Sequence, residues 1–269
     1  MAFMSPVLTV MTRAAEKASR SLIRDFNEVE HLQVSRKGPG DFVSAADKRA
    51  EEIIYAELSK ARPDFGFLME ENGEIKGRGG EFRFIIDPLD GTTNFLHGIP
   101  QWSITIALEK KNADGSLEIV SGLVFDPIKN EMFFAEKGTG AFLQRKRLRV
   151  SARDDLSLSI IGGGDCVRRD ATLKNALTQS LSKIINVTAG YRRLGSAALD
   201  LSYVAAGRLD AFWEMRLSAW DCAAGALIVR EAGGKVESLK GDTNPVYADV
   251  LLASNLVLHE HVKSLITVA

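Results

Sequence analysis

The sequence predicts an α+β protein in which β-sheets are layered between α-helices. Three observations lead to this fold class. Apolar residues recur at helical spacing over residues 6–28, so the chain opens with an amphipathic helix. Short stretches rich in aromatic and β-branched residues follow between residues 65 and 136, separated by turn residues. The second half then alternates strands with helices, which is typical of sheets covered by helices.

The first half is predicted to contain two helices followed by strands. The first helix is indicated by apolar residues three and four positions apart: Val7, Val10, Met11, Ala14, Ala18, Leu22 and Phe26. A polar stretch that includes residues 38–40 ends it. Ser44 and Asp47 open a second helix in an arrangement similar to a capping box, and Pro63 stops that helix. Strands are expected at residues 65–69, 82–87, 101–109, 117–125 and 131–136.

The second half is predicted to alternate strands and helices. The strands are expected near 157–162 and 187–191 and at 209–214 and 249–253. The helices are expected near 170–185 and at 196–206, 221–232 and 257–267. We divide the chain into an N-terminal α+β part, residues 1–145, and a C-terminal α/β part, residues 146–269. No long linker separates the two parts, so they are expected to form one compact unit.

The composition is that of an ordinary globular protein. Of the 269 residues, 45% are hydrophobic and 26% are charged, and the net charge is −1. This balance gives no reason to expect a nucleic-acid partner or an anionic membrane. No signal peptide or membrane span is evident, so we expect a cytoplasmic protein. The two cysteines, Cys166 and Cys222, lie far apart, which excludes zinc held by cysteines and argues against a disulfide framework.

One segment carries the most informative pattern. It reads Phe84-Ile85-Ile86-Asp87-Pro88-Leu89-Asp90-Gly91-Thr92-Thr93-Asn94-Phe95. An apolar strand places Asp87 at its end and the chain turns through Asp90 and Gly91, so the two carboxylates can point at one place. Gly91 permits a backbone conformation that a Cβ atom would obstruct. Residues 92–93 then offer N–H groups and hydroxyls at the start of a short helical turn, which suits an anion.

Further carboxylates occur at the ends of other predicted elements. Glu70 and Glu71 end a strand, and Asp221 is expected immediately before a helix. Several carboxylates brought together without a cation would be forced to take up protons. A divalent cation removes this conflict. Because the ligands are all oxygen atoms, Mg²⁺, Mn²⁺ or Ca²⁺ is favoured over zinc.

The chain resembles the inositol monophosphatase family, a group of Mg²⁺-dependent, lithium-sensitive phosphatases, and most of all its bacterial inositol-1-monophosphatases. The resemblance rests on three motifs in order: Glu70-Glu71, the segment Asp87–Phe95, and Trp220-Asp221 with Glu231-Ala232-Gly233-Gly234. It extends to Lys37-Gly38 through Asp41, Ser44, Asp47 and Arg193–Ala198. Residues 162–169 depart from the Gly-Phe-Pro-like sequence that many relatives have there. That loop borders the substrate in the family, so the departure leaves the substrate open.

The resemblance implies a layered α-β-α-β-α sandwich and a set of site residues. The implied metal ligands are Glu70, Asp87, Asp90, Asp221 and the backbone carbonyl of Leu89. The implied contacts to phosphate or polyol come from Asp90, Gly91, Thr92, Ala197 and Glu214. Glu70 and Thr92 would act as the catalytic pair that orients the attacking water. The family also implies two or three Mg²⁺ ions per site, with Mn²⁺ as a substitute, and a homodimer.

The expected function is hydrolysis of a small polyol phosphate monoester, foremost inositol monophosphate, by in-line attack of a metal-activated water. Other small substrates handled by relatives are alternatives: fructose 1,6-bisphosphate, 3′-phosphoadenosine 5′-phosphate and histidinol phosphate. A non-enzymatic interaction protein on the same fold is a further alternative, with the basic residues 145–149 as its contact surface. These basic residues are also explained as a solvated hairpin, given the neutral net charge.

For three of the residues discussed above, a purely structural role is an alternative to a role in the site. Glu214 could be the partner of an arginine instead of a substrate contact. Asp47 is explained by helix capping alone, and a supporting role beside the metal is the alternative. Asp221 could serve as an N-cap, which does not exclude metal binding.

Overall fold

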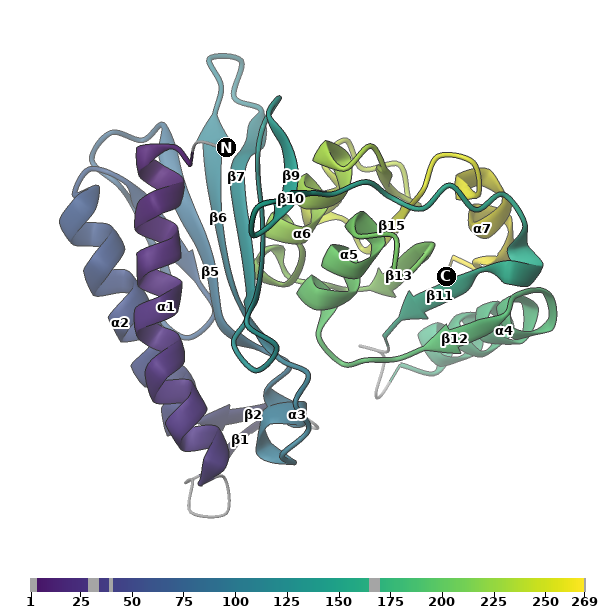
Figure 1. Cartoon of the computed structure of the whole chain (residues 1–269), viewed down its shortest axis with the longest axis horizontal. Coiled ribbons are helices and arrows are strands. Elements are labelled where there is room, and N and C mark those ends of the chain that lie inside the picture. Colours follow the sequence, from purple (N-terminus) through teal and green to yellow (C-terminus); the bar gives the residue numbers. More distant parts are fainter. Residues whose placement is uncertain (1–3, 29–33, 39–40, 165–169, 269) are drawn as a thin grey trace.

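The computed structural model describes residues 4–28, 34–38, 41–164 and 170–268, with the backbone alone for 34–38 and 41–44. The described chain is built as five layers, in which two sheets alternate with three groups of helices (Figure 1). The predicted layered α+β sandwich is therefore confirmed.

The first layer consists of two long helices. Helix α1 (Pro6–Asn27) and helix α2 (Ala45–Ala61) pack against each other and cover one face of the larger sheet (Figure 1). Ser5 caps α1, since its Oγ accepts a hydrogen bond from the Leu8 N–H at 3.1 Å. Both helices agree closely with the sequence prediction because their apolar stripes are regular.

The larger sheet has eight strands in the order β10-β9-β8-β7-β6-β5-β3-β4. The strands are β3 (Gly66–Met69), β4 (Gly73–Ile75), β5 (Phe82–Asp90), β6 (Ser103–Lys111), β7 (Leu117–Asp126), β8 (Glu131–Glu136), β9 (Gly140–Leu143) and β10 (Lys146–Arg147). Strand β3 runs parallel to β5, and the other neighbours are antiparallel. The carboxyl ends of β3 and β5 therefore lie at the same edge of the sheet.

The remaining three layers come from the second half of the chain. Helices α5 (Ala197–Ala205) and α6 (Ala219–Glu231) lie between the two sheets. The smaller sheet has the strands β12 (Gly190–Arg192), β11 (Ile160–Gly163), β13 (Ala211–Met215), β15 (Val250–Ser254) and β14 (Lys235–Ser238), in this order. Helices α4 (Ala171–Val187) and α7 (His259–Leu265) form the outermost layer (Figure 1).

The structure corrects several sequence predictions. No strand was predicted around the polar stretch that includes residues 38–40, but the antiparallel pair β1 (Val34–Gly38) and β2 (Asp41–Ser44) lies there. Strands β4, β9, β10 and β14 were not predicted either. The strand expected near 187–191 is wrong in its start, because α4 continues to Val187 and β12 begins at Gly190. Ile184 and its β-branched neighbours favour a strand locally, but burial of Ile184 against the smaller sheet keeps them helical.

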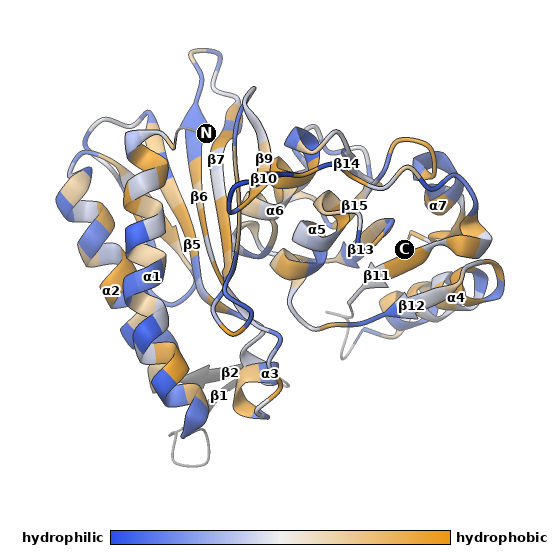
Figure 2. Cartoon of the chain, viewed as in Figure 1, coloured by the Kyte–Doolittle hydropathy of each residue, from blue (hydrophilic) through white to orange (hydrophobic). Residues whose placement is uncertain are grey.

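The core falls into three apolar clusters: one between α1, α2 and the larger sheet, one around α5 and α6 between the two sheets, and one between the smaller sheet and the helices α4 and α7. Figure 2 shows the corresponding pattern on α1, where hydrophobic and hydrophilic residues alternate around the helix. Phe95 and Trp102 are fully buried in the cluster beneath α1 and α2, where their rings meet edge-on with centroids 5.1 Å apart. None of the helices in the described residues combines the length and apolar character that crossing a membrane requires.

Candidate metal centre

The end of β5 carries two buried carboxylates on one side. Asp87 pairs with Thr105 of β6 and Asp90 pairs with Ser103, so β5 holds one extra residue between these two pairs. In a regular strand, residues three apart point to opposite faces, and the bulge removes this alternation. Asp87 is 2% exposed and Asp90 is 8% exposed. The bulge is thus the local reason that both side chains can reach one site.

The end of β3 adds two more carboxylates beside Asp87. The Glu70 N–H donates to the Ile86 carbonyl at 3.3 Å and so continues the parallel pairing of β3 with β5. Glu70 and Glu71 are half-buried, and Asp47 in the first turn of α2 is 1% exposed. One carboxylate oxygen from each of Asp47, Glu70 and Glu71 lies within 4.8 Å of the other two.

The sequence placed Asp221 immediately before a helix, and the structure corrects this position. Helix α6 begins at Ala219, so Asp221 is its third residue, and Ser218 is the N-cap. The Ser218 N–H donates to Asp221 Oδ2 at 2.7 Å, which is one half of a capping box. Thr105 Oγ1 donates to the Trp220 carbonyl at 2.9 Å and thereby ties the start of α6 to β6. Capping therefore orients this carboxylate.

Asp90 connects the two halves of the molecule. Its Oδ2 accepts hydrogen bonds from Ser196 Oγ at 2.5 Å and from the Ala198 N–H at 2.9 Å, both at the start of α5. Ser196 also caps α5 by accepting from the Leu199 N–H. Ser196 was part of a motif that supported the family resemblance, but the sequence contained no sign that it would hold Asp90.

These contacts bring the candidate ligands together. Asp87, Asp90 and Asp221 each place one carboxylate oxygen within 4.8 Å of the other two. Burial, and after it the charges of Glu70, Asp90 and Asp221, raise the pKa of Asp87 well above its usual range. Burial also raises the pKa of Asp90 to about 6, although hydrogen bonds from Ser196 and Ala198 oppose this rise. Burial and the charge of Asp90 raise the pKa of Asp221 in the same way.

The donor set fits a hard divalent cation. The ligand candidates offer carboxylate oxygens, and mutually repelling buried carboxylates require a positive charge or protons. Oxygen ligands of this kind are those that Mg²⁺ prefers. The carbonyl of Leu89, predicted as a further ligand, belongs to the same segment. The N–H group of Leu89 donates a hydrogen bond to Asp87 Oδ1 at 2.8 Å.

The segment after Asp90, where the sequence predicts an anion cradle, passes through a left-handed backbone conformation at Gly91. Gly91 has φ +97°, and a Cβ atom there would lie 3.0 Å from the Gln101 carbonyl oxygen and 3.2 Å from that of Gly195. A Cβ atom would thus be obstructed at position 91, as predicted from the sequence, and this explains why the residue is glycine. Thr92 opens the short helix α3 (Thr92–Leu96), and its Oγ1 donates to the Leu89 carbonyl at 3.0 Å.

A cavity of about 320 Å³ adjoins these residues. It is lined by Asp90, Thr93, Asn94, Gly164, Arg193, Leu194, Gly195, Ser196, Ala197, Asp200, Glu214, Leu217 and Asp221. Predicted metal ligands and predicted substrate contacts thus share one space. Of the departing loop 162–169, Gly164 lines this space, whereas 165–169 lie outside the described residues. A Cβ atom at Gly164 would lie 2.0 Å from Glu214 Oε1, so this glycine makes room for Glu214.

One carboxylate of the cavity, that of Asp200, was not predicted from the sequence. Asp200 of α5 is 2% exposed, and within the described parts of the chain its Oδ1 has no hydrogen-bond partner. Burial, then the charges of Glu214 and Asp90, raise the pKa of Asp200 well above its usual range. A single aspartate inside an apolar helix stretch carries no sequence signal for this position.

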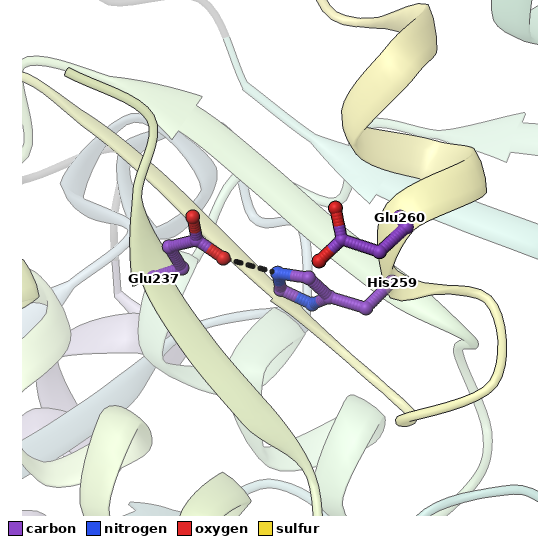
Figure 3. Close-up of side chains that lie close together, drawn as sticks. All are labelled: Glu237, His259 and Glu260. Carbon is purple, nitrogen blue, oxygen red and sulfur yellow. Dashed lines mark hydrogen bonds and ion pairs between the residues drawn. The ribbon is translucent and has the colours of Figure 1, made fainter. Parts of the chain in front are cut away.

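A second cluster of potential ligands lies outside the lining of the cavity, between strand β14 of the smaller sheet and helix α7. Figure 3 shows Glu237 of β14 facing His259 and Glu260 of α7. His259 is buried, and its two ring nitrogens contact Glu237 Oε2 at 2.9 Å and Ser254 Oγ at 2.7 Å. Two lysines pair with the same carboxylates: Lys235 Nζ lies 2.7 Å from Glu237 and 3.0 Å from Glu260, and Lys263 Nζ lies 2.5 Å from Glu237. Ammonium groups supply the positive charge here, so the cluster is an ion-pair network that holds α7 on β14.

Glu237→Gln is expected to destabilise the fold by about 1–2 kcal/mol at pH 7. The ion pairs with Lys235 and Lys263 lower the pKa of Glu237 to about 2. A carboxyl with a lowered folded-state pKa stabilises the fold above its unfolded value of about 4.3, and this contribution is lost as the pH falls toward 2. Urea unfolding of both proteins at pH 7 and pH 3 should show a difference that shrinks at acid pH. Glu16→Gln, at an exposed position outside this network, serves as the control. Equal midpoints at pH 7 would contradict the expectation.

Comparisons with known proteins agree with this arrangement. Residues 4–267 match the sequence model of the Inositol monophosphatase family. An inositol-1-monophosphatase of Mesorhizobium japonicum is 52% identical over 254 residues, which cover 94% of this chain and 93% of that protein. A protein of Pseudomonas aeruginosa named Nus factor SuhB is 43% identical over 94% of this chain and 92% of its own length.

A solved structure has the same fold. The crystal structure of the extragenic suppressor protein suhB from Bartonella henselae superposes with a TM-score of 0.91 at 49% sequence identity. The superposition covers 97% of this chain and 98% of that chain. With a family match over nearly the whole length and relatives at this level of identity, the chain belongs to the inositol monophosphatase family.

Proposed function

We propose that this protein is a Mg²⁺-dependent phosphatase that hydrolyses inositol monophosphate or a closely similar polyol phosphate. The observation that carries the proposal is the convergence of Asp87, Asp90 and Asp221, whose carboxylate oxygens lie within 4.8 Å of one another beside a cavity. The proposal includes two or three Mg²⁺ ions held by the implied ligand set, including Glu70 and the Leu89 carbonyl. It also includes the family's homodimer, which a monomer in sedimentation at micromolar concentration would remove.

The residues around the cluster support a hydrolytic reaction. Bound Mg²⁺ would lower the pKa of water and neutralise the charge that the phosphate brings. Thr92 Oγ1 donates its proton to the Leu89 carbonyl, so the hydroxyl oxygen is left to accept a hydrogen bond from a water molecule. The Glu70 carboxylate, an acceptor, lies at the neighbouring strand end. Together Glu70 and Thr92 would orient the attacking water in line with the leaving group, while Gly91 and Thr92 N–H groups hold the phosphate.

The cavity supports a small polyol as the leaving group. Its volume of about 320 Å³ lies at the small end of the range of roughly 300–1,000 Å³ found for ligand sites. Asp90, Ala197 and Glu214, the predicted polyol contacts, all line it. Carboxylates and a helix end offer acceptors and a donor for hydroxyl groups. A cyclitol monophosphate suits this space better than the larger 3′-phosphoadenosine 5′-phosphate.

The test is phosphate release from a panel of substrates with and without Mg²⁺. Inositol 1-phosphate is expected to be hydrolysed only with Mg²⁺, and at least tenfold faster than the three alternative substrates. The alternatives are fructose 1,6-bisphosphate, 3′-phosphoadenosine 5′-phosphate and histidinol phosphate. A tenfold preference for one of these three would overturn the substrate assignment but keep the reaction class. Turnover that is unchanged by EDTA would overturn the metal-dependent mechanism.

A second role as an interaction protein is supported by a separate observation. Relatives with about 40% identity are named Nus factor SuhB, and the hairpin after β9 exposes Arg145, Lys146, Arg147 and Arg149. The solvated-hairpin interpretation explains the same exposure. A pull-down of partners that survives Asp87→Asn, although phosphatase activity vanishes, would separate this role from catalysis. Loss of the same partners on replacing the four basic residues by Ser would assign the role to the hairpin.

A further inference from the structure

Glu51 of α2 is a fully buried carboxylate directed at the turn between β3 and β4. It is 0% exposed. Its Oε2 accepts from the Glu71 N–H at 2.9 Å, and its Oε1 accepts from the Asn72 N–H at 2.9 Å and from Asn72 Nδ2 at 2.6 Å. Both carboxylate oxygens are therefore used, and all three donors belong to two consecutive residues of one turn.

This turn carries the metal-ligand candidate Glu70. Strand β3 ends at Met69 and β4 begins at Gly73, so the turn consists of residues 70–72. The Glu70 N–H is held by β5 on one side, at the Ile86 carbonyl. Glu51 holds the next two residues from the other side. The direction in which the Glu70 side chain leaves the backbone is thus determined between a strand and a helix.

Helix α2 presents a second acidic residue to the same turn. Asp47 lies four residues before Glu51, so both project from one face of the helix. A carboxylate oxygen of Asp47 lies within 4.8 Å of one from Glu70 and one from Glu71. Because Glu51 ties the turn to α2 one helical turn away, it also determines how far Glu70 lies from Asp47.

The fold alone does not require a carboxylate at this position. Glu71 is half-buried and Asn72 is exposed, so water could satisfy the N–H groups of a turn at the surface. Burial of a carboxylate is unfavourable, whereas the turn could fold without one. What the three hydrogen bonds add is a fixed backbone geometry in a turn that would otherwise be free to move.

We propose that Glu51 is a positioning residue for the metal centre: it holds the turn 70–72 so that the Glu70 carboxylate is in place before a cation binds. The inference rests on the proposed function, since it assumes that Glu70 is a metal ligand. Residues that orient ligands in this way typically change metal affinity by about 10–100-fold when they are replaced. The expected signature is weaker metal binding, with turnover restored when the metal is saturating.

The experiment is a titration of the metal-free protein with Mn²⁺, followed by the EPR signal of the free ion, on wild type, Glu51→Gln and Glu52→Gln. Glutamine at position 51 keeps the size but turns one acceptor into a donor that faces an N–H group. Glu51→Gln is expected to raise the Kd for Mn²⁺ at least fivefold, with kcat at saturating Mg²⁺ within threefold of wild type. Glu52→Gln makes the same change at the exposed neighbouring position, and its Kd is expected to match wild type.

A folded Glu51→Gln protein whose Kd rises less than fivefold would overturn the inference. So would a loss of kcat at saturating Mg²⁺ beyond threefold. If circular dichroism shows Glu51→Gln to be unfolded, the same Mn²⁺ titration of Asn72→Ala tests the inference. This variant removes one hydrogen-bond donor to Glu51 from an exposed position. A Kd raised at least threefold would then support the inference, and a smaller rise would overturn it. Absence of Mn²⁺ binding by wild type would instead overturn the proposed metal centre, and the inference with it.

Discussion

Asp87→Asn is expected to lower the Mg²⁺-dependent phosphatase activity by about 10³-fold or more without unfolding the protein. The asparagine Oδ1 can keep the hydrogen bond from the Leu89 N–H, which is 2.8 Å long in the wild type. It lacks the charge that holds a cation. A bound metal contributes several kcal/mol to catalysis, and about 4 kcal/mol corresponds to a factor of about 10³ in rate. Phosphate release from inositol 1-phosphate at saturating Mg²⁺ measures the loss.

The same substitution is expected to stabilise the metal-free protein. Burial and neighbouring carboxylates raise the pKa values of Asp87 and Asp221, and burial raises that of Asp90 to about 6. A carboxyl with a raised folded-state pKa stabilises the fold below its unfolded value of about 3.9, and this contribution is lost as the pH rises through the folded pKa. Metal-free wild type should therefore lose stability between about pH 4 and pH 7. Asp87→Asn removes one of the repelling charges, so the metal-free variant should lose less stability than wild type over the same pH range.

Thermal unfolding in EDTA at pH 4 and pH 7.5 tests this expectation. At pH 7.5 the melting temperature of Asp87→Asn should exceed that of wild type by a few degrees, since about 1 kcal/mol corresponds to about 2–4 °C in chains of 150–250 residues. At pH 4 the melting temperatures of the two proteins should converge. Addition of Mg²⁺ at pH 7.5 should raise the melting temperature of wild type only. Asp154→Asn, at an exposed position, is the control for the chemical change. A metal-free Asp87→Asn that melts below wild type at pH 7.5 would contradict the account of the cluster.

Gly91→Ala is expected to reduce both stability and activity. The residue has φ +97°, which costs an alanine about 1–2 kcal/mol. Its Cβ atom would also lie 3.0 Å from the Gln101 carbonyl oxygen and 3.3 Å from the Trp102 Cα, both backbone atoms that cannot move independently. Such overpacking adds about 1–3 kcal/mol. The displaced N–H groups of residues 91 and 92 should lower turnover at least tenfold, because small misplacements of a binding group are costly.

Gly98→Ala is the matched control for this prediction. Gly98 also has a positive φ, +67°, but a Cβ atom there would meet nothing within 4 Å. It should therefore show the conformational cost alone, with activity close to wild type. Urea unfolding and phosphate release on both variants separate backbone strain from the close approach. Equal losses of stability in the two variants would show that the contact with residues 101, 102 and 195 does not matter.

The sequence predicted the parts of this protein that depend on local patterns. The stripes of α1 and α2 have regular spacing, so their positions follow from helix geometry and burial. The segment Asp87–Phe95 combines a strand end, a glycine and adjacent threonines, which is enough to predict clustered carboxylates and a cradle. Short strands such as β4, with three residues, leave too little pattern to detect.

Other features depend on residues far apart in the chain. Ser196 donates a hydrogen bond to Asp90, which lies 106 positions away in the sequence. Thr105 donates to the Trp220 carbonyl at the start of α6, which lies 115 positions away. Asp200 and Glu51 are single acidic residues on helices, and their surroundings come from neighbouring layers. A helix boundary shifted by two residues also changed Asp221 from a residue before α6 into a capping residue within its first turn.

The sequence by itself therefore determined the layered fold class, the family and which carboxylates are candidates for a metal. These follow from periodicity and from motifs in which the chemistry lies within a few residues. Only the tertiary structure decided the directions in which the carboxylates point. Four features determine them: the bulge in β5, the cap of α6, the hydrogen bond from Ser196 to Asp90, and the hydrogen bonds between Glu51 and the turn 70–72. The physical reason is that the direction of a side chain depends on backbone register and on donors from other layers. Neither is encoded in the spacing of residues along the chain.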